Sequence, residues 1–171
     1  VLRVDYYEPE DLFHIINLIL LWDKYFKIPY DLHYIGLSNE SKTMAWIDVI
    51  DENNAEGPLK DQYEKLTEPW GGVDNILKIH RLNPESLTAH VQLYKTIMFG
   101  KSPIRRTDRE MIAVVVSAIN QCHYWMTHHG EGLLKLTKNE ALVNQLKSDY
   151  TLADISPTQM EMLNYVAKLT E

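Results

Sequence analysis

The sequence predicts an all-α helical bundle, and three observations lead to this fold class. Apolar residues recur at helical spacing along most of the chain, and helix-start and helix-stop signals divide it into segments of helical length. Alternating apolar and polar runs long enough for strands are missing from the sequence. The 171 residues, 45% of them hydrophobic, are enough for one compact unit with a substantial core.

The first 43 residues allow two interpretations. In one, residues 9–27 form a helix with apolar side chains near helical spacing, and residues 29–39 are a connection rich in turn-forming residues. In the other, residues 1–43 are an extension and Met44 is a natural start. The sequence leaves both open, and we predict a domain over residues 44–171 that follows this extension.

Three helices are expected before residue 101. Residues 58–67 begin with a proline after a glycine and end before Pro69, which suits a short helix, and residues 75–82 form another short segment. The third helix opens with Asn83 as N-cap, a proline at the first position and an acid in the first turn, and Gly100 ends it.

The most apolar helix follows. Thr107-Asp-Arg-Glu110 has the pattern of a capping box ahead of the apolar run 111–119. The β-branched residues 114–116 are compatible with a strand, but the cap and the length of the run favour a buried helix. An Asn-Gln pair interrupts this run before a further helix that starts at Cys122.

Two later helices are indicated by the same capping logic. Thr137-Lys-Asn-Glu140 precedes a predicted helix over residues 138–147, and Ser156-Pro-Thr-Gln159 precedes one over residues 157–169.

Composition excludes several function classes. The formal net charge of -7 argues against a nucleic-acid surface, and no apolar run reaches the ~18 residues that a membrane span needs. No secretory signal is visible, and a single cysteine, Cys122, excludes an intrachain disulfide. We therefore expect a cytoplasmic protein that binds neither nucleic acid nor membrane.

The spacing around Cys122 points to a site. Cys122, Trp125 and His129 are three and then four residues apart, so a helix places them on one face, where one ligand can touch all three. At a helix start, orphan N–H groups and the macrodipole stabilise the reactive thiolate and lower the pKa of a cysteine. The competing interpretations are a buried, inert cysteine, a core histidine, and a Glu110 that serves only its capping box.

Residues 109–130 resemble the signature of the alkylhydroperoxidase-D-like, carboxymuconolactone decarboxylase family, and are closest to its peroxidase-related branch. That signature is Glu, eleven residues, then Cys-x-x-Cys-x-x-x-His, and Glu110, Cys122 and His129 fall on three of its four key positions. Trp125 stands at the second cysteine. The resemblance runs from about residue 44 to the end, and it implies a homo-oligomeric helical bundle that here lacks the family's last helices.

The resemblance implies a thiol-dependent peroxidase-like antioxidant protein. Cys122 would be the redox centre, His129 and Glu110 a proton relay, and Trp125 and Tyr124 the lining of the pocket. In the family the cysteine nearer the histidine is generally assigned to face the peroxide, and Trp125 occupies that position. Because the second cysteine is absent, a cycle that forms a disulfide within the site is impossible for this sequence. The expected partners are a peroxide or other small-molecule substrate and an external thiol reductant.

Other functions are also compatible with the sequence. The protein can be a redox-inactive oligomer that binds a small molecule, or an enzyme of the decarboxylase type. Residue 125 can also be natively Cys or selenocysteine, if the printed Trp is a misread UGA codon. A metal site from Cys122, His123, His128 and His129 is disfavoured because the usual paired ligand spacing is lacking, and no cofactor is indicated.

Overall fold

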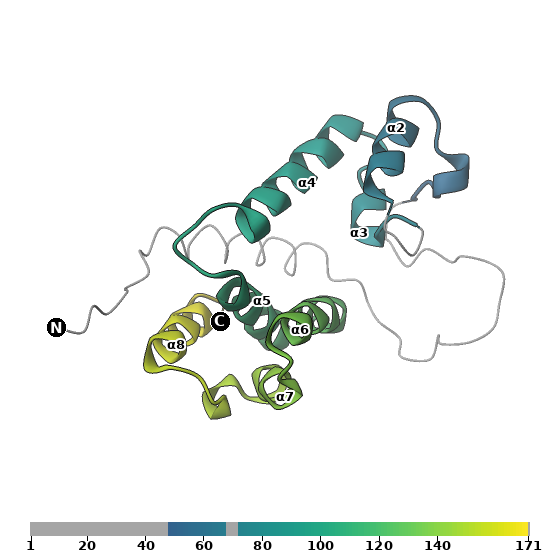
Figure 1. The fold of residues 1–171 in the computed structure, drawn as a ribbon. Helices are drawn as coiled ribbons and strands as arrows, with labels where there is room; N and C mark the ends of the chain where they lie inside the picture. Colours follow the sequence, from purple (N-terminus) through teal and green to yellow (C-terminus); the bar gives the residue numbers. More distant parts are fainter. Residues whose placement is uncertain (1–47, 68–71, 171) are drawn as a thin grey trace, which may run out of the picture. The chain divides into compact units, whose positions relative to one another are not determined.

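The computed structural model describes residues 48–67 and 72–170 (Figure 1). Its elements are η1 (Glu52–Asn54), α2 (Gly57–Leu66), α3 (Asn75–Lys78), α4 (Pro84–Phe99), α5 (Arg106–Ile119), α6 (His123–Thr137), α7 (Glu140–Ser148), η2 (Tyr150–Leu152) and α8 (Pro157–Thr170). No strand occurs in these residues, so the all-α prediction is confirmed for the described part of the chain. None of the described helices is long and apolar enough to cross a membrane.

The chain divides into two compact units, and the division falls inside α4, between Tyr94 and Lys95. The expectation of one compact unit is therefore wrong. The helix expected over residues 9–27, the connection over 29–39 and the start at Met44 lie outside the described residues. The domain predicted over 44–171 stays a prediction.

The unit that ends at Tyr94 has a small apolar core. Its buried members come from the residue that follows η1, from α2 and α4, and from the segment between α2 and α3, and they are Ala55, Leu59, Tyr63, Val73 and Leu87. The phenol of Tyr63 donates a hydrogen bond to the carbonyl of Ile50 at 3.2 Å. The predicted Asn83 cap is confirmed, because its Oδ1 accepts the Ser86 N–H at 3.1 Å.

Two histidines of this unit form a hydrogen-bonded chain. His80 Nδ1 lies 2.8 Å from Ser86 Oγ, and His80 Nε2 lies 2.7 Å from His90 Nδ1. Burial lowers the pKa of His80. Burial, and then the neighbouring charge of His80, lower the pKa of His90 to about 4. The folded state therefore favours neutral imidazoles in this pair.

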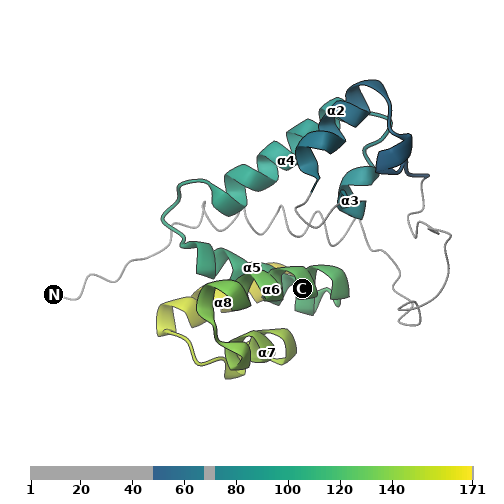
Figure 2. The ribbon, with the colours of Figure 1, turned by 45° about the vertical axis from the view of Figure 1, so that its right-hand side comes forward.

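In the other unit α5 is the central helix. Helices α6, α7 and α8 each pack against it (Figure 1), and Figure 2 shows the same grouping from a second direction. All residues of α5 from Asp108 to Ser117 are buried. A helix that is apolar over most of its circumference is stable only when it is surrounded in this way, which explains the uninterrupted apolar run of the sequence.

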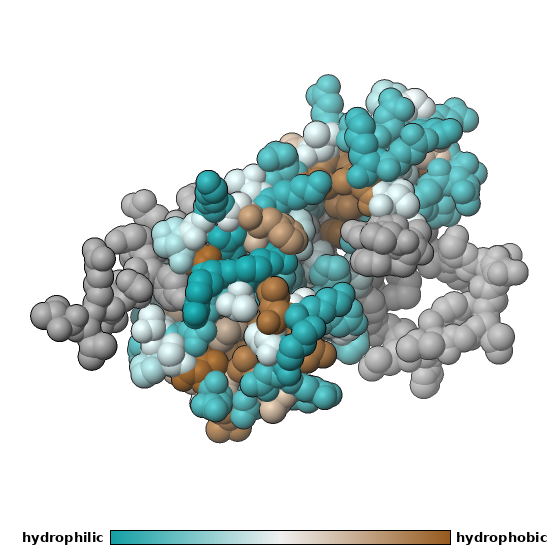
Figure 3. Space-filling model, in the orientation of Figure 1, coloured by the Kyte–Doolittle hydropathy of each residue, from teal (hydrophilic) through white to brown (hydrophobic). Residues whose placement is uncertain are grey.

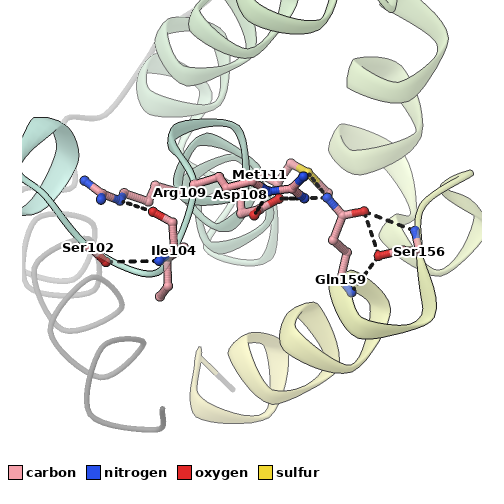
Figure 4. Close-up of polar contacts among 8 residues, drawn as sticks. Ser102, Ile104, Asp108, Arg109, Met111, Ser156 and Gln159 are labelled. Carbon is pink, nitrogen blue, oxygen red and sulfur yellow. Dashed lines mark hydrogen bonds and ion pairs between the residues drawn. The ribbon is translucent and has the colours of Figure 1, made fainter. Parts of the chain in front are cut away.

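Charged side chains connect α5 to its neighbours. Buried Arg109 donates to the carbonyls of Ile97, Gly100 and Ile104 at 2.8, 2.9 and 2.9 Å, and Figure 4 shows the bond to Ile104. The first two of these carbonyls lie at the end of α4, where helical partners are lacking. Asp108, also buried, accepts from Arg105 at 2.8 Å and from Gln159 at 2.7 Å, which ties α5 to α8.

Of the three predicted capping boxes, one is confirmed. Ser156 and Gln159 cap α8 reciprocally: the Gln159 N–H donates to Ser156 Oγ at 3.3 Å, and the Ser156 N–H donates to Gln159 Oε1 at 3.1 Å (Figure 4). The box at Thr137 is wrong, because α6 runs through Thr137 and ends at left-handed Lys138. Asn139 caps α7 instead, through a 3.0 Å bond from the Leu142 N–H.

The box at Thr107 is also wrong. Helix α5 begins at Arg106, with Arg105 in extended conformation at the N-cap and no side-chain cap bond, so Thr107 already lies inside the first turn. Glu110 therefore has no cap to complete, and its carboxylate is free to bond to residues outside the first turn of α5.

On the face drawn in Figure 3, hydrophilic side chains cover much of the described surface, with smaller hydrophobic patches between them.

Candidate functional site

The junction between α5 and α6 fixes the backbone of Cys122. Gln121 takes the left-handed conformation, with a φ of 56°. The N–H of Gln121 donates to the Ala118 carbonyl at 3.0 Å, and the N–H of Cys122 donates to the Ser117 carbonyl at 2.8 Å. This pair of bonds is the Schellman motif, which ends a helix by satisfying carbonyls of its last turn.

Cys122 is at the same time the N-cap of α6. Its carbonyl accepts the Met126 N–H at 3.0 Å, while its side chain makes no cap hydrogen bond. The side chain is half-buried. The sequence prediction that Cys122 stands at a helix start is confirmed, and both helices hold its backbone.

Glu110 and His129 form a buried pair between α5 and α6. Glu110 Oε2 lies 2.7 Å from His129 Nδ1, and the two residues are 2% and 4% exposed. The fold therefore brings together two of the three residues that the sequence predicted as catalytic. Because Nδ1 is engaged with the carboxylate, Nε2 is the ring nitrogen of His129 that can act on another group.

The second oxygen of Glu110 is also held. Arg106 Nη2 donates to Glu110 Oε1, and Arg106 Nη1 donates to the Met98 carbonyl at 2.7 Å. The Arg106 guanidinium lies over the Phe99 ring, 3.9 Å from its centroid. Sequence reasoning missed Arg106. Its spacing four residues before Glu110, at which opposite charges pair along a helix, was the available signal.

Gly132 leaves room for the Glu110 carboxylate. A Cβ atom at Gly132 would lie 3.0 Å from Glu110 Oε1 and 3.2 Å from its carboxyl carbon. The carboxylate thus packs against the backbone of α6 at a position where any side chain would crowd it.

Aromatic rings cover the imidazole. Trp125, 5% exposed, stacks on His129 with ring centroids 5.4 Å apart and an interplanar angle of 27°. Tyr124 meets the edge of Trp125 at 4.9 Å. Both residues predicted to line a pocket therefore lie beside the site, and their role as a pocket lining stays a prediction.

Ser117 is a second residue that sequence reasoning missed. It lies seven residues from Glu110, so both project from the same side of α5. Ser117 is fully buried, and its Oγ has no hydrogen-bond partner among the described residues. Its carbonyl receives the Cys122 N–H, which places Ser117 at the cysteine end of the helix pair.

No metal centre is seen in the described residues, where no group of three or more His, Cys, Asp or Glu side chains could hold an ion. Two of the histidines considered as ligands, His123 and His128, are exposed.

The fold and site define a class of protein: an all-α protein in which a buried carboxylate–imidazole pair joins two helices whose junction is capped by a cysteine. Comparison with known proteins gives a family match for part of the chain. Residues 84–146 match the model of the carboxymuconolactone decarboxylase family. This segment contains Glu110, Cys122 and His129.

A solved structure also resembles this chain. The chain is similar to an uncharacterised peroxidase-related protein from Silicibacter sp. TM1040, with 37% sequence identity and a TM-score of 0.59. The match covers 65% of this chain and 58% of that protein, so the chain spans less than two thirds of its relative's length. No curated protein matches the chain. The resemblance inferred from the sequence motif is confirmed.

Proposed function

We propose that the protein is a thiol-dependent peroxidase that works with one cysteine. The observation that carries this proposal is the buried hydrogen bond between Glu110 and His129, on the two helices whose junction holds Cys122 at the N-cap of α6. A carboxylate–imidazole pair on the two helices whose junction carries a helix-start cysteine supplies groups that can form a thiolate and move protons during peroxide reduction. The similarity to a peroxidase-related protein of solved structure favours this reaction over decarboxylation.

The reaction balances with an external thiol. The Cys122 thiolate attacks one peroxide oxygen, the O–O bond breaks, and the sulfur is oxidised to a sulfenic acid while an alkoxide leaves and takes up a proton. An external thiol then condenses with the sulfenic acid, which releases water and leaves a mixed disulfide. A second external thiol attacks that disulfide and returns Cys122 to the thiol.

The Glu110–His129 pair would serve the proton transfers. Glu110 accepts a hydrogen bond from Nδ1–H and so fixes the ring orientation, which leaves Nε2 to accept the thiol proton and to donate it to the leaving alkoxide. An external thiol is needed because Trp125 stands where the family motif has its second cysteine, so no cysteine in the site can resolve the sulfenic acid. We also propose that the protein is a cytoplasmic homo-oligomer.

The direct test is to treat the protein with an alkyl hydroperoxide and trap Cys122 sulfenic acid with dimedone. We expect one adduct on Cys122, none in Cys122→Ser, and peroxide consumption that depends on an added low-molecular-weight thiol. Absence of both the adduct and thiol-dependent consumption would contradict the proposal.

A second candidate is a redox-inactive protein that binds a small molecule. The stacking of Trp125 on His129 favours it, since the indole covers one face of the ring that would relay protons. Trp125→Cys separates the two functions: gain of turnover by the cysteine pair shows that the remaining site is competent, whereas continued inactivity favours binding. The codon of residue 125 shows whether the residue is tryptophan or selenocysteine, since a UGG codon there excludes selenocysteine.

A further inference from the structure

The Glu110–His129 pair has a third member that reaches the surface. We propose that Arg106 is a positioning residue of this site, which holds Glu110 in the orientation that fixes the Nδ1 proton of His129. This inference rests on the proposed function for its effect on peroxide chemistry. Its structural part, the control of the imidazole, does not depend on that function.

The contacts of Arg106 fix its guanidinium from three sides. One nitrogen donates to the Met98 carbonyl at 2.7 Å, another donates to Glu110 Oε1, and the Phe99 ring lies 3.9 Å below the central carbon. The side chain is 29% exposed, while that of Glu110 is 3% exposed. The arginine therefore carries the link from the protein surface to a carboxylate inside the core.

The buried Glu110 carboxylate requires a positively charged partner. A buried carboxylate is costly unless it is paired and hydrogen-bonded, and a neutral imidazole supplies a hydrogen bond without a full positive charge. Arg106 stays protonated at every relevant pH and supplies that charge. Without Arg106, the Glu110 carboxylate loses the donor that holds Oε1, and His129 Nδ1 loses an acceptor of fixed orientation.

The place of Arg106 in α5 argues against a role in helix stability. Arg106 is the first residue of α5, and positive charges are unfavourable at the N-terminal end of the helix macrodipole. Its benefit must therefore come from its partners, of which Glu110 is the charged one.

Neighbouring Arg105 offers a matched control. It also belongs to the start of α5, and it also pairs with a buried carboxylate, that of Asp108, at 2.8 Å. Asp108 is tied to Gln159 and not to His129 in the described contacts. Arg105→Gln therefore removes the same charge and an equivalent ion pair without touching the imidazole.

The experiment compares Arg106→Gln, Arg106→Lys and Arg105→Gln in the whole chain. Two-bond ¹H–¹⁵N NMR correlations report which ring nitrogen of His129 carries the proton, and dimedone trapping reports the rate at which an alkyl hydroperoxide oxidises Cys122. We expect R106Q to lose the single Nδ1–H tautomer and to slow oxidation on the order of 10-fold, less than the ~10²–10⁴-fold of a whole general acid–base contribution, because His129 itself is retained. R106K should recover part of both effects, because it restores the charge without the planar fork. R105Q should keep the parental signals and rate.

The proposal is overturned if R106Q keeps the parental His129 signals, or if R105Q changes them equally. Should R106Q fail to fold, the same comparison between R106K and R105Q decides. If the parent protein itself shows no oxidation of Cys122, the proposed peroxidase function fails, and the NMR comparison still tests the positioning role.

Discussion

His129 Nδ1 and Glu110 Oε2 lie 2.7 Å apart across the α5–α6 interface, although the two residues are 19 positions apart in the sequence. The pair is almost fully excluded from water. This contact links two helices that also pack against each other, determines which imidazole nitrogen is engaged, and gives a structural reason for the spacing of the motif.

Glu110→Gln should impair both folding and reactivity. The amide cannot serve Arg106 and His129 as the carboxylate does, because one of its two ends is a donor. We expect a loss of about 1–3 kcal/mol in the free energy of unfolding, measured by urea denaturation, and slower oxidation of Cys122. Exposed Glu161→Gln, inside α8, is the control and should change neither quantity. Equal stability of both variants would show that the buried pair contributes little.

Two glycines of α6 should respond differently to alanine. A Cβ at Gly132 would crowd the Glu110 carboxylate at 3.0 Å, so Gly132→Ala should lower the rate of Cys122 oxidation. A Cβ at Gly130 would meet the Lys147 Cε and Nζ at 2.5 and 2.7 Å, which are the end of a flexible side chain that can move away. Gly130→Ala should therefore leave the rate unchanged and gain up to ~1 kcal/mol from helix propensity. Thermal unfolding and dimedone trapping check both variants, and equal rates would count against the crowding argument.

Ser117→Ala should not destabilise the protein. The Ser117 hydroxyl is buried without a partner among the described residues, so its removal relieves a desolvation cost of about 1–3 kcal/mol. We expect an equal or higher free energy of unfolding by chemical denaturation. A clear loss of stability would mean that the hydroxyl is hydrogen-bonded in solution, for example to water. Ser148→Ala, on the exposed end of α7, provides the comparison.

The histidine pair predicts a pH dependence of stability. The pKa of His90 is lowered to about 4 in the folded state, against about 6.5 in the unfolded chain, so the unfolded state binds more protons between these values. The contribution of neutral His90 to the free energy of unfolding is therefore fully present above pH 6.5 and is lost as the pH falls toward 4. Solvent screening of this partly exposed group limits the expected loss to about 1–2 kcal/mol.

Urea denaturation between pH 7 and pH 4 measures this dependence. His90→Gln should flatten it, whereas His123→Gln, at an exposed position of the other unit, should leave it as it is. An unchanged pH profile in His90→Gln would assign the acid sensitivity to other groups.

Local signals in the sequence determined most helix boundaries. The Asn83 cap, the stop at Gly100 and the Ser156–Gln159 box were predicted correctly, because capping depends on a few neighbouring residues. The spacing of Glu110, Cys122 and His129 was likewise readable, and the Schellman junction that places Cys122 at a helix start needs only the residues around it.

Only the tertiary structure decided what Glu110 does. In the sequence, Thr107 and Glu110 form a capping box as convincing as the one at Ser156, because the pattern contains no information about the helix that packs against it. The start of α5 at Arg106 removes that cap and leaves the carboxylate to His129 and Arg106. The stacking of Trp125 on His129 was equally beyond the sequence. Partners across a helix interface are chosen by packing, whereas the boundaries of each helix are largely chosen by its own residues.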